Sequence, residues 1–182
     1  MRRRSWLQAA ALAAPVFIRQ ARAADTPRFE LGVASGQPRP DGMVLWTRLT
    51  GPDLPPQVEV RWEVAHDEAF ARIVASGSDR AEDAWAHSVH AEPAGLEAGR
   101  WYWYRFRALG QVSRTGRTRT APAPDATATL RLAIASCQRW DHGHYAAWRH
   151  LARQDLDLVA FLGDYIYEYP SGPTAIRRHD GG

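Results

Sequence analysis

The residues best suited to chemistry in this sequence are a thiol, a carboxylate and a phenol in its last third. Cys137 follows the apolar run Leu130 to Ala135, and Asp164 follows a second apolar run, Leu156 to Leu162. Tyr167 comes three residues after Asp164, within a reach of about 10 Å. A thiolate, a carboxylate and a phenolate at one place would form an anionic pocket suited to a highly charged metal ion.

Two strands and a helix would bring these residues together. Between the two apolar runs, the segment Tyr145 to Gln154 carries apolar residues at helical spacing, so the pattern predicts strand, helix, strand. Strands joined in this way are parallel, and functional residues gather at their carboxyl ends. Neighbouring strands lie about 4.8 Å apart, so Cys137 and Asp164 would open into one crevice. Gly163 would let the backbone and a metal ion approach closely.

Other interpretations of these residues are open. Cys137 can be a small buried hydrophobe, with Asp164 capping the next segment and Tyr167 packing. Cys137 can also be the nucleophile of a thiol hydrolase, with His142 or His144 as its base. The other histidines expected to be structural or solvated are His66, His87, His90 and His150.

Residues 29 to 120 predict a small antiparallel β-sandwich of fibronectin-III or immunoglobulin type. Apolar or alternating runs recur at roughly 8 to 14 residue intervals between Gly, Pro and Asp turn signals. Leu96 and Gly99 precede an aromatic run, as at the late strand of such domains, where a Tyr tucks under a corner. The aromatic side chains are expected in the core, with a ligand platform as the alternative. The expected strands are Phe29 to Ala34, Met43 to Leu49, Val58 to Ala65, Ile73 to Ser76, Ser88 to Glu92, Trp101 to Ala108 and Thr115 to Thr120.

The fold class is therefore mixed, with the sandwich followed by the first βαβ unit of a truncated α/β domain. The segment 121 to 128 is rich in Pro and Ala and has no periodicity, which is typical of a short interdomain linker. The second domain is expected over residues 129 to 182.

Residues 1 to 23 predict an export signal. They combine an Arg cluster, the apolar stretch Trp6 to Ile18 and a small-x-small cleavage site ending at Ala23. The apolar stretch is shorter than the roughly 20 residues of a membrane-spanning helix, so no permanent membrane span is expected. Arg3 to Gln8 resembles the twin-arginine pattern, with an ordinary Sec signal as the alternative. The twin-arginine export machinery is thus an expected partner, and the periplasm or the extracellular space the expected location.

Charge and cysteine content exclude several classes of function. The signal carries five Arg and no acidic residue, so its removal takes the formal net charge from +3 to −2. No remaining run of like charge suggests a nucleic-acid partner. A single Cys allows neither an internal disulfide nor a multi-Cys zinc site.

The sequence resembles the PhoD-like alkaline phosphatases over nearly its whole length. The spacing from the Cys to the Asp, with Tyr three residues further on, is the specific part of the resemblance. The stretches that resemble the start of the metallophosphatase domain are Ala135 to Gln138, Gly143 to Tyr145, Asp157 to Val159 and Leu162 to Glu168. Those that resemble the N-terminal domain of the family are Leu31 to Pro38, Val44 to Leu49 and Gly116 to Thr120.

This resemblance implies a secreted phosphohydrolase that acts on phosphomonoesters and phosphodiesters with Fe³⁺ and Ca²⁺. Cys137 and Tyr167 would correspond to ligands of the ferric ion. Asp164 would be the catalytic carboxylate that bridges iron and calcium. A ferric ion would lower the pKa of a bound water, while calcium would hold the phosphoryl oxygens, so that no side-chain nucleophile is needed.

The resemblance also indicates that part of the site is missing. Such sites take further Asp, Asn and His ligands from later strands, and this sequence contains no Asn. A sheet of two parallel strands also needs cover on both faces. We therefore expect the N-terminal part of a longer enzyme, inactive by itself. The alternative is an exported fibronectin-like binding module with a non-catalytic phosphatase remnant.

Overall fold

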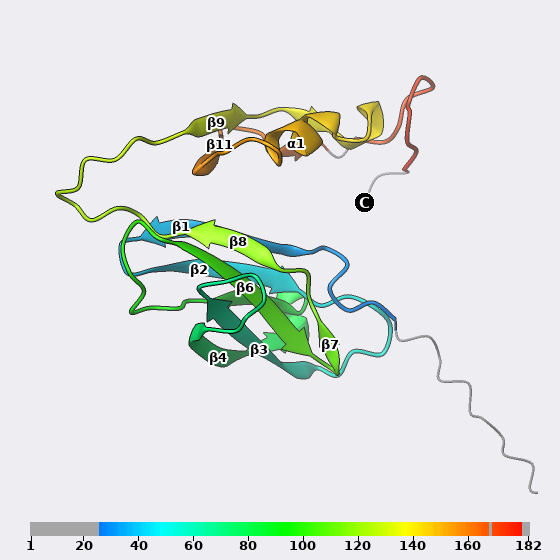
Figure 1. The fold of residues 1–182 in the computed structure, drawn as a ribbon. Helices are drawn as coiled ribbons and strands as arrows, with labels where there is room; N and C mark the ends of the chain where they lie inside the picture. Colours follow the sequence, from blue (N-terminus) through cyan, green and yellow to red (C-terminus); the bar gives the residue numbers. More distant parts are fainter. Residues whose placement is uncertain (1–25, 168, 180–182) are drawn as a thin grey trace, which may run out of the picture.

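The computed structural model describes residues 26–167 and 169–179, and it is built mostly of β-strands with one α-helix (Figure 1). The predicted export signal lies outside the described residues. The first part of the chain forms strands β1 (Val33–Arg39), β2 (Gly42–Arg48), β3 (Gln57–Ala65), β4 (Ile73–Glu82), β5 (Ser88–Ala91), β6 (Trp101–Ala108), β7 (Gln111–Val112) and β8 (Gly116–Arg119). The second part contains β9 (Leu132–Ala135), β10 (Gln138–Arg139), α1 (Ala146–Leu151), β11 (Leu158–Phe161) and β12 (Ile166–Tyr167).

Two antiparallel sheets share one hydrophobic core in the first part of the chain. One sheet has the order β1-β2-β5, and the other has the order β4-β3-β6-β7 with β8 also paired to β6. Alternate residues of β6 are buried, which places one face of the strand in the core and leaves the other towards solvent. Tyr102, Tyr104 and Phe106 from β6 belong to the same buried cluster as Met43 and Leu45 from β2.

The strands with regular alternation lie where the sequence predicts them, and two others differ. The residues Phe29 to Gly32 form a turn instead of the start of a strand, because Gly32 has φ +76° and its N–H donates to the carbonyl of Phe29 at 3.0 Å. Strand β4 continues past the predicted end at Ser76. Gly77 does not make a turn there, since it lies against the Trp62 ring, which a Cβ would approach to 2.5 Å.

A buried tyrosine closes the corner before β6. The hydroxyl of Tyr102 accepts a hydrogen bond from the backbone N–H of Glu97 at 2.8 Å, and its ring stacks on His66 with centroids 5.3 Å apart. The sequence predicts a tyrosine under the corner formed by Leu96, Gly99 and the aromatic run. The hydrogen bond between Glu97 and Tyr102 lies at this corner.

We expect Tyr102→Phe to lower the free energy of unfolding by about 1–2 kcal/mol, because the Glu97 N–H would lose its acceptor in a part-buried place. Urea unfolding followed by circular dichroism measures this change. Tyr165→Phe is the matched control, since Tyr165 is 60% exposed. Equal midpoints for the two variants would show that the corner bond contributes nothing.

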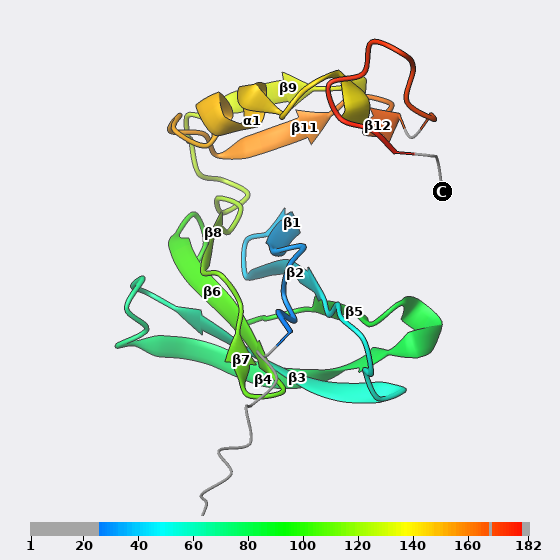
Figure 2. The ribbon, with the colours of Figure 1, turned by 90° about the vertical axis from the view of Figure 1, so that its right-hand side faces the viewer.

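The second part of the chain contains a pair of short parallel strands. β9 and β11 pair in register from Leu132 opposite Leu158 to Ala135 opposite Phe161, and α1 lies between them in the sequence. Figure 2 shows α1 beside this pair, across the connecting segment from the first two sheets. The helix is shorter than its apolar pattern predicts. It starts one residue late, because Tyr145 adopts a left-handed conformation with φ 54°, and it ends at Leu151, three residues before the predicted end. Within the described residues, no helix is long and apolar enough to cross a bilayer.

Candidate metal centre

Cys137 and Asp164 lie side by side just beyond the carboxyl ends of β9 and β11. The pairing of the two strands continues past the last ladder residues, since the N–H of Leu162 donates to the carbonyl of Ala135 at 3.0 Å. One step further, the N–H of Cys137 donates to the carbonyl of Asp164 at 2.7 Å. The parallel register thus brings together two residues that the sequence predicted to share one crevice.

The backbone turns sharply at this edge. Cys137 has φ +56°, a left-handed conformation that is uncommon for a residue with a side chain and that costs about 1–3 kcal/mol where it is enforced. Gly163 has φ +83°. A Cβ at Gly163 would meet no atom within 4 Å, so the positive φ, and not contact with a neighbouring residue, is what favours glycine at this position.

Tyr167 is directed to the same place by a second short pair of parallel strands. β10 pairs with β12, so that Arg139 lies opposite Tyr167. The Tyr167 hydroxyl donates to Oδ2 of Asp164 at 2.6 Å, and the side chain of Cys137 lies beside the same hydroxyl. These two contacts, with that to Asp164 the larger, raise the pKa of the Tyr167 phenol. A thiol, a carboxylate and a phenol therefore meet on one exposed edge.

This donor set fits part of a metal site. Thiolate, carboxylate and phenolate are all anionic when deprotonated, and together they suit a highly charged cation. Cys137 is a free, exposed thiol, so an ion can reach it from solvent. Among the described residues, no group of three or more His, Cys, Asp or Glu side chains could hold a metal ion. Tyr167 must therefore be counted as a donor, and further ligands would have to come from elsewhere.

The described contacts of Cys137 do not include a histidine. The thiol contacts the Tyr167 phenol, and its backbone N–H bonds to Asp164. His142 instead has its Nε2 3.9 Å from Oδ1 of Asp141. This arrangement favours a ligand role for Cys137 over that of a nucleophile activated by a base.

A buried acid beside the centre carries no signal in the sequence. Asp141 is 1% exposed and accepts from Nε and Nη2 of Arg139 at 2.7 and 3.2 Å, which together with the charge of Arg139 lowers the pKa of Asp141. The carbonyl of Asp141 accepts from the N–H groups of Ile176 and Arg177. The Asp141 carboxylate thus holds Arg139 of β10, and the Asp141 backbone carbonyl holds the segment around Ile176 next to this strand.

Arg177 is held between two aromatic rings near the same edge. The central carbon of its guanidinium lies 4.2 Å from the ring centroid of Trp140 and 4.7 Å from that of Tyr145. Stacking of this kind stabilises a cation. In the described part of the chain, its Nε and Nη2 and the Tyr145 hydroxyl are buried without a hydrogen-bond partner.

The arrangement is typical of enzymes that bind their ligands at one edge of an open parallel sheet. A β-domain precedes parallel strands whose carboxyl ends carry the polar side chains, which is where enzymes built on open parallel sheets bind their ligands. Comparison with known proteins makes this class specific. The chain belongs to the PhoD-like phosphatase family, because the model of the PhoD-like phosphatase N-terminal domain matches residues 11–122 and the model of PhoD-like phosphatase matches residues 132–181.

Two relatives support this assignment. Alkaline phosphatase D of Bacillus subtilis (strain 168) is 51% identical over 153 residues, which are 80% of this chain and 26% of that protein. The solved structure of PhoD superposes with a TM-score of 0.76 at 49% identity and covers 79% of this chain and 29% of its own. The chain thus spans between a quarter and a third of the length of these relatives. The family expected from the sequence motifs is confirmed.

Proposed function

We propose that this chain is the N-terminal part of a secreted, metal-dependent alkaline phosphatase and phosphodiesterase. The observation that carries the proposal is the meeting of Cys137, Asp164 and Tyr167 at one strand edge in a member of the PhoD-like phosphatase family. Such an enzyme hydrolyses phosphate esters with a metal-activated water, so it needs no nucleophilic side chain.

The residues of the centre have distinct roles in this proposal. Cys137 and Tyr167 would hold Fe³⁺, and Asp164 would supply a carboxylate to both Fe³⁺ and Ca²⁺. When bound, these ions supply Lewis acidity towards water and the phosphoryl oxygens. The protein orients the ligands: the backbone bond between Cys137 and Asp164 fixes the separation of the two strand ends, and the phenol of Tyr167 holds the carboxylate of Asp164.

We further propose a domain organisation for the chain. Residues 29–120 would form the fibronectin-like sandwich, 121–128 the linker and 129–182 the first βαβ unit of the metallophosphatase domain. The shared core of two antiparallel sheets and the parallel pairing of β9 with β11 support this division. Residues 1–23 would direct export by the twin-arginine route to the periplasm or the outside of the cell.

Exposed apolar side chains support the proposal that further residues complete the catalytic domain. Leu132 and Ile134 of β9 are 48% and 62% exposed, Leu158 of β11 is 41% exposed, and Leu162 after it is 58% exposed. Strands of parallel sheets are normally covered on both faces. Additional helices and strands would bury these side chains and bring the remaining metal ligands.

We expect the isolated 182-residue chain to show no phosphatase activity, because three ligands at an exposed edge do not enclose an ion and a substrate. Hydrolysis of p-nitrophenyl phosphate with added Fe³⁺ and Ca²⁺ tests this, with the full-length protein as the positive control. Turnover by the isolated chain would contradict the proposed incompleteness. A full-length protein without turnover on mono- or diesters would instead favour the binding module with a non-catalytic remnant.

A further inference from the structure

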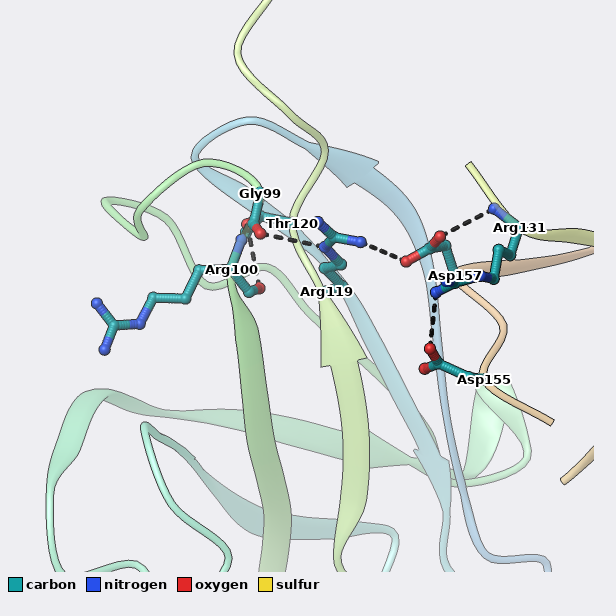
Figure 3. A network of polar contacts seen from close by, with 7 residues as sticks. All are labelled: Gly99, Arg100, Arg119, Thr120, Arg131, Asp155 and Asp157. Carbon is teal, nitrogen blue, oxygen red and sulfur yellow. Dashed lines mark hydrogen bonds and ion pairs between the residues drawn. The ribbon is translucent and has the colours of Figure 1, made fainter. Parts of the chain in front are cut away.

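An ion pair connects the two parts of the chain at the end opposite to the candidate metal centre (Figure 3). Arg119 is the last residue of β8, and its Nη1 donates to Oδ1 of Asp157, the residue just before β11. The two side chains are 28% and 11% exposed. Charged side chains with so little exposed surface interact more strongly than fully exposed pairs. Removal of one partner leaves the other poorly solvated.

The Arg119 end of this pair is fixed to the first part of the chain. Its Nε donates to the carbonyl of Gly99 at 3.1 Å, and its guanidinium carbon lies 5.7 Å from the Trp101 ring centroid. Thr120, the next residue, donates from its N–H to the carbonyl of Arg100 at 3.1 Å and from its hydroxyl to the carbonyl of Glu97 at 2.6 Å. The start of the linker and the guanidinium are therefore both held on the sandwich.

The Asp157 end fixes the beginnings of both parallel strands. Oδ2 of Asp157 accepts from the backbone N–H of Arg131 at 2.9 Å, and the N–H of Asp157 donates to the carbonyl of Arg131 at 2.9 Å. The backbone N–H of Arg131, followed by the Arg119 guanidinium, lowers the pKa of Asp157. The Asp157 carboxylate thus contacts both the chain before β9 and the sandwich, and the backbone N–H of Asp157 joins the start of β11 to that of β9.

We propose that Asp157 is a positioning residue that docks the β9–β11 pair on the sandwich through Arg119 and thereby sets the place of Cys137 and Asp164 at the other end of these strands. Four residues of strand, about 13 Å at about 3.3 Å each, separate the two ends. The sandwich then serves to orient the catalytic edge, and it is not an independently tethered binding domain. The expected effect on turnover rests on the proposed function. The expected effect on cleavage after Arg131 rests on the contacts alone.

The neighbouring Asp155 provides a matched control. It pairs with the side chain of the same Arg131 at 2.7 Å, but these two side chains are 70% and 62% exposed. Exposed pairs of this kind contribute little. Asp155→Asn therefore makes the same chemical change two residues away without touching the sandwich.

The test uses the full-length protein with Asp157→Asn, Arg119→Gln, the double variant and Asp155→Asn. Asparagine keeps an oxygen for the Arg131 N–H but loses the charge that Arg119 binds. We expect each single variant to speed tryptic cleavage after Arg131 by about 10-fold, because local opening of the chain just before β9 then requires fewer broken contacts. We expect kcat for p-nitrophenyl phosphate to fall by about 10- to 100-fold with KM little changed, since small misplacements of reacting groups have effects of this size.

The double variant tests whether Arg119 and Asp157 act through one shared contact, here called the clamp, or through two unrelated effects. Because both single variants break the same contact, the double variant should be no worse than the poorer single one, and Asp155→Asn should stay within about twofold of the parent in both assays. Three results would overturn the clamp. The effects of the two substitutions could multiply in the double variant, Asp155→Asn could have the same effect as Asp157→Asn, or the single variants could leave cleavage unchanged. If the parent protein has no phosphatase activity, the proposed function fails, and the cleavage rates still decide the inference. Arg119→Gln acts from the sandwich side, so it tests the clamp even if Asp157→Asn does not fold.

Discussion

Replacement of Cys137 by serine in the full-length protein is expected to remove bound iron and phosphatase activity together. A serine hydroxyl stays protonated near neutral pH and is a weak ligand, whereas a thiol readily becomes the thiolate that binds metal ions. Loss of a Lewis acid that contributes several kcal/mol corresponds to a fall in kcat/KM of about 10³-fold or more. Elemental analysis and p-nitrophenyl phosphate kinetics on the same preparation measure both effects.

The two roles open to Cys137 give different results in this experiment. As a metal ligand, its loss lowers iron content and activity in parallel. As a thiol nucleophile, its loss would lower activity with the metal content unchanged. Ser136→Ala is the matched control, because Ser136 is the adjacent exposed residue, and it should retain both metal and activity. An active Cys137→Ser protein would contradict both roles.

Asp164→Asn is expected to have an effect of similar size for an electrostatic reason. The amide occupies the same volume and can still accept the hydrogen bond from Tyr167, which is 2.6 Å long in the parent protein, but it carries no charge for the bridging position. We expect kcat on both p-nitrophenyl phosphate and bis-p-nitrophenyl phosphate to fall by about 10³-fold, with calcium and iron both reduced.

The exposed carboxylate of Asp155 again provides a control for the chemical change itself. Asp155→Asn removes one negative charge from the same part of the chain and should leave turnover within about twofold of the parent. If Asp164→Asn keeps more than about a tenth of the parent kcat with full metal content, Asp164 does not bridge the ions, and the bond from Tyr167 has only a structural role.

Regular alternation of side chains made the first part of the fold predictable. Strand β6 has the predicted bounds, Trp101–Ala108, and every second residue along it, from Tyr102 to Ala108, is buried. Glycine limited the prediction elsewhere. Gly32 makes a turn inside an expected strand, while Gly77 continues a strand past an expected turn because it lies against Trp62. The local sequence does not distinguish these two uses of glycine.

The sequence predicts that the residues of the candidate centre lie close together, but it does not predict the hydrogen bonds between them. Parallel strands of matched length place Cys137 beside Asp164 whatever their side chains do. The bond from Tyr167 to Asp164 depends on how the chain turns after β11. The pair between Arg119 and Asp157 spans 38 residues of sequence and joins the two parts of the chain, so no spacing or periodicity signals it. Its two members have the same appearance in the sequence as solvated surface charges.

The most direct test of the proposed metal-dependent phosphatase is the metal content and turnover of one preparation of the full-length protein, measured before and after chelation. We predict that the protein purified without added metal contains iron and calcium, hydrolyses p-nitrophenyl phosphate, and loses turnover as the chelator removes these ions. Undiminished hydrolysis by a preparation that contains neither ion would contradict the account.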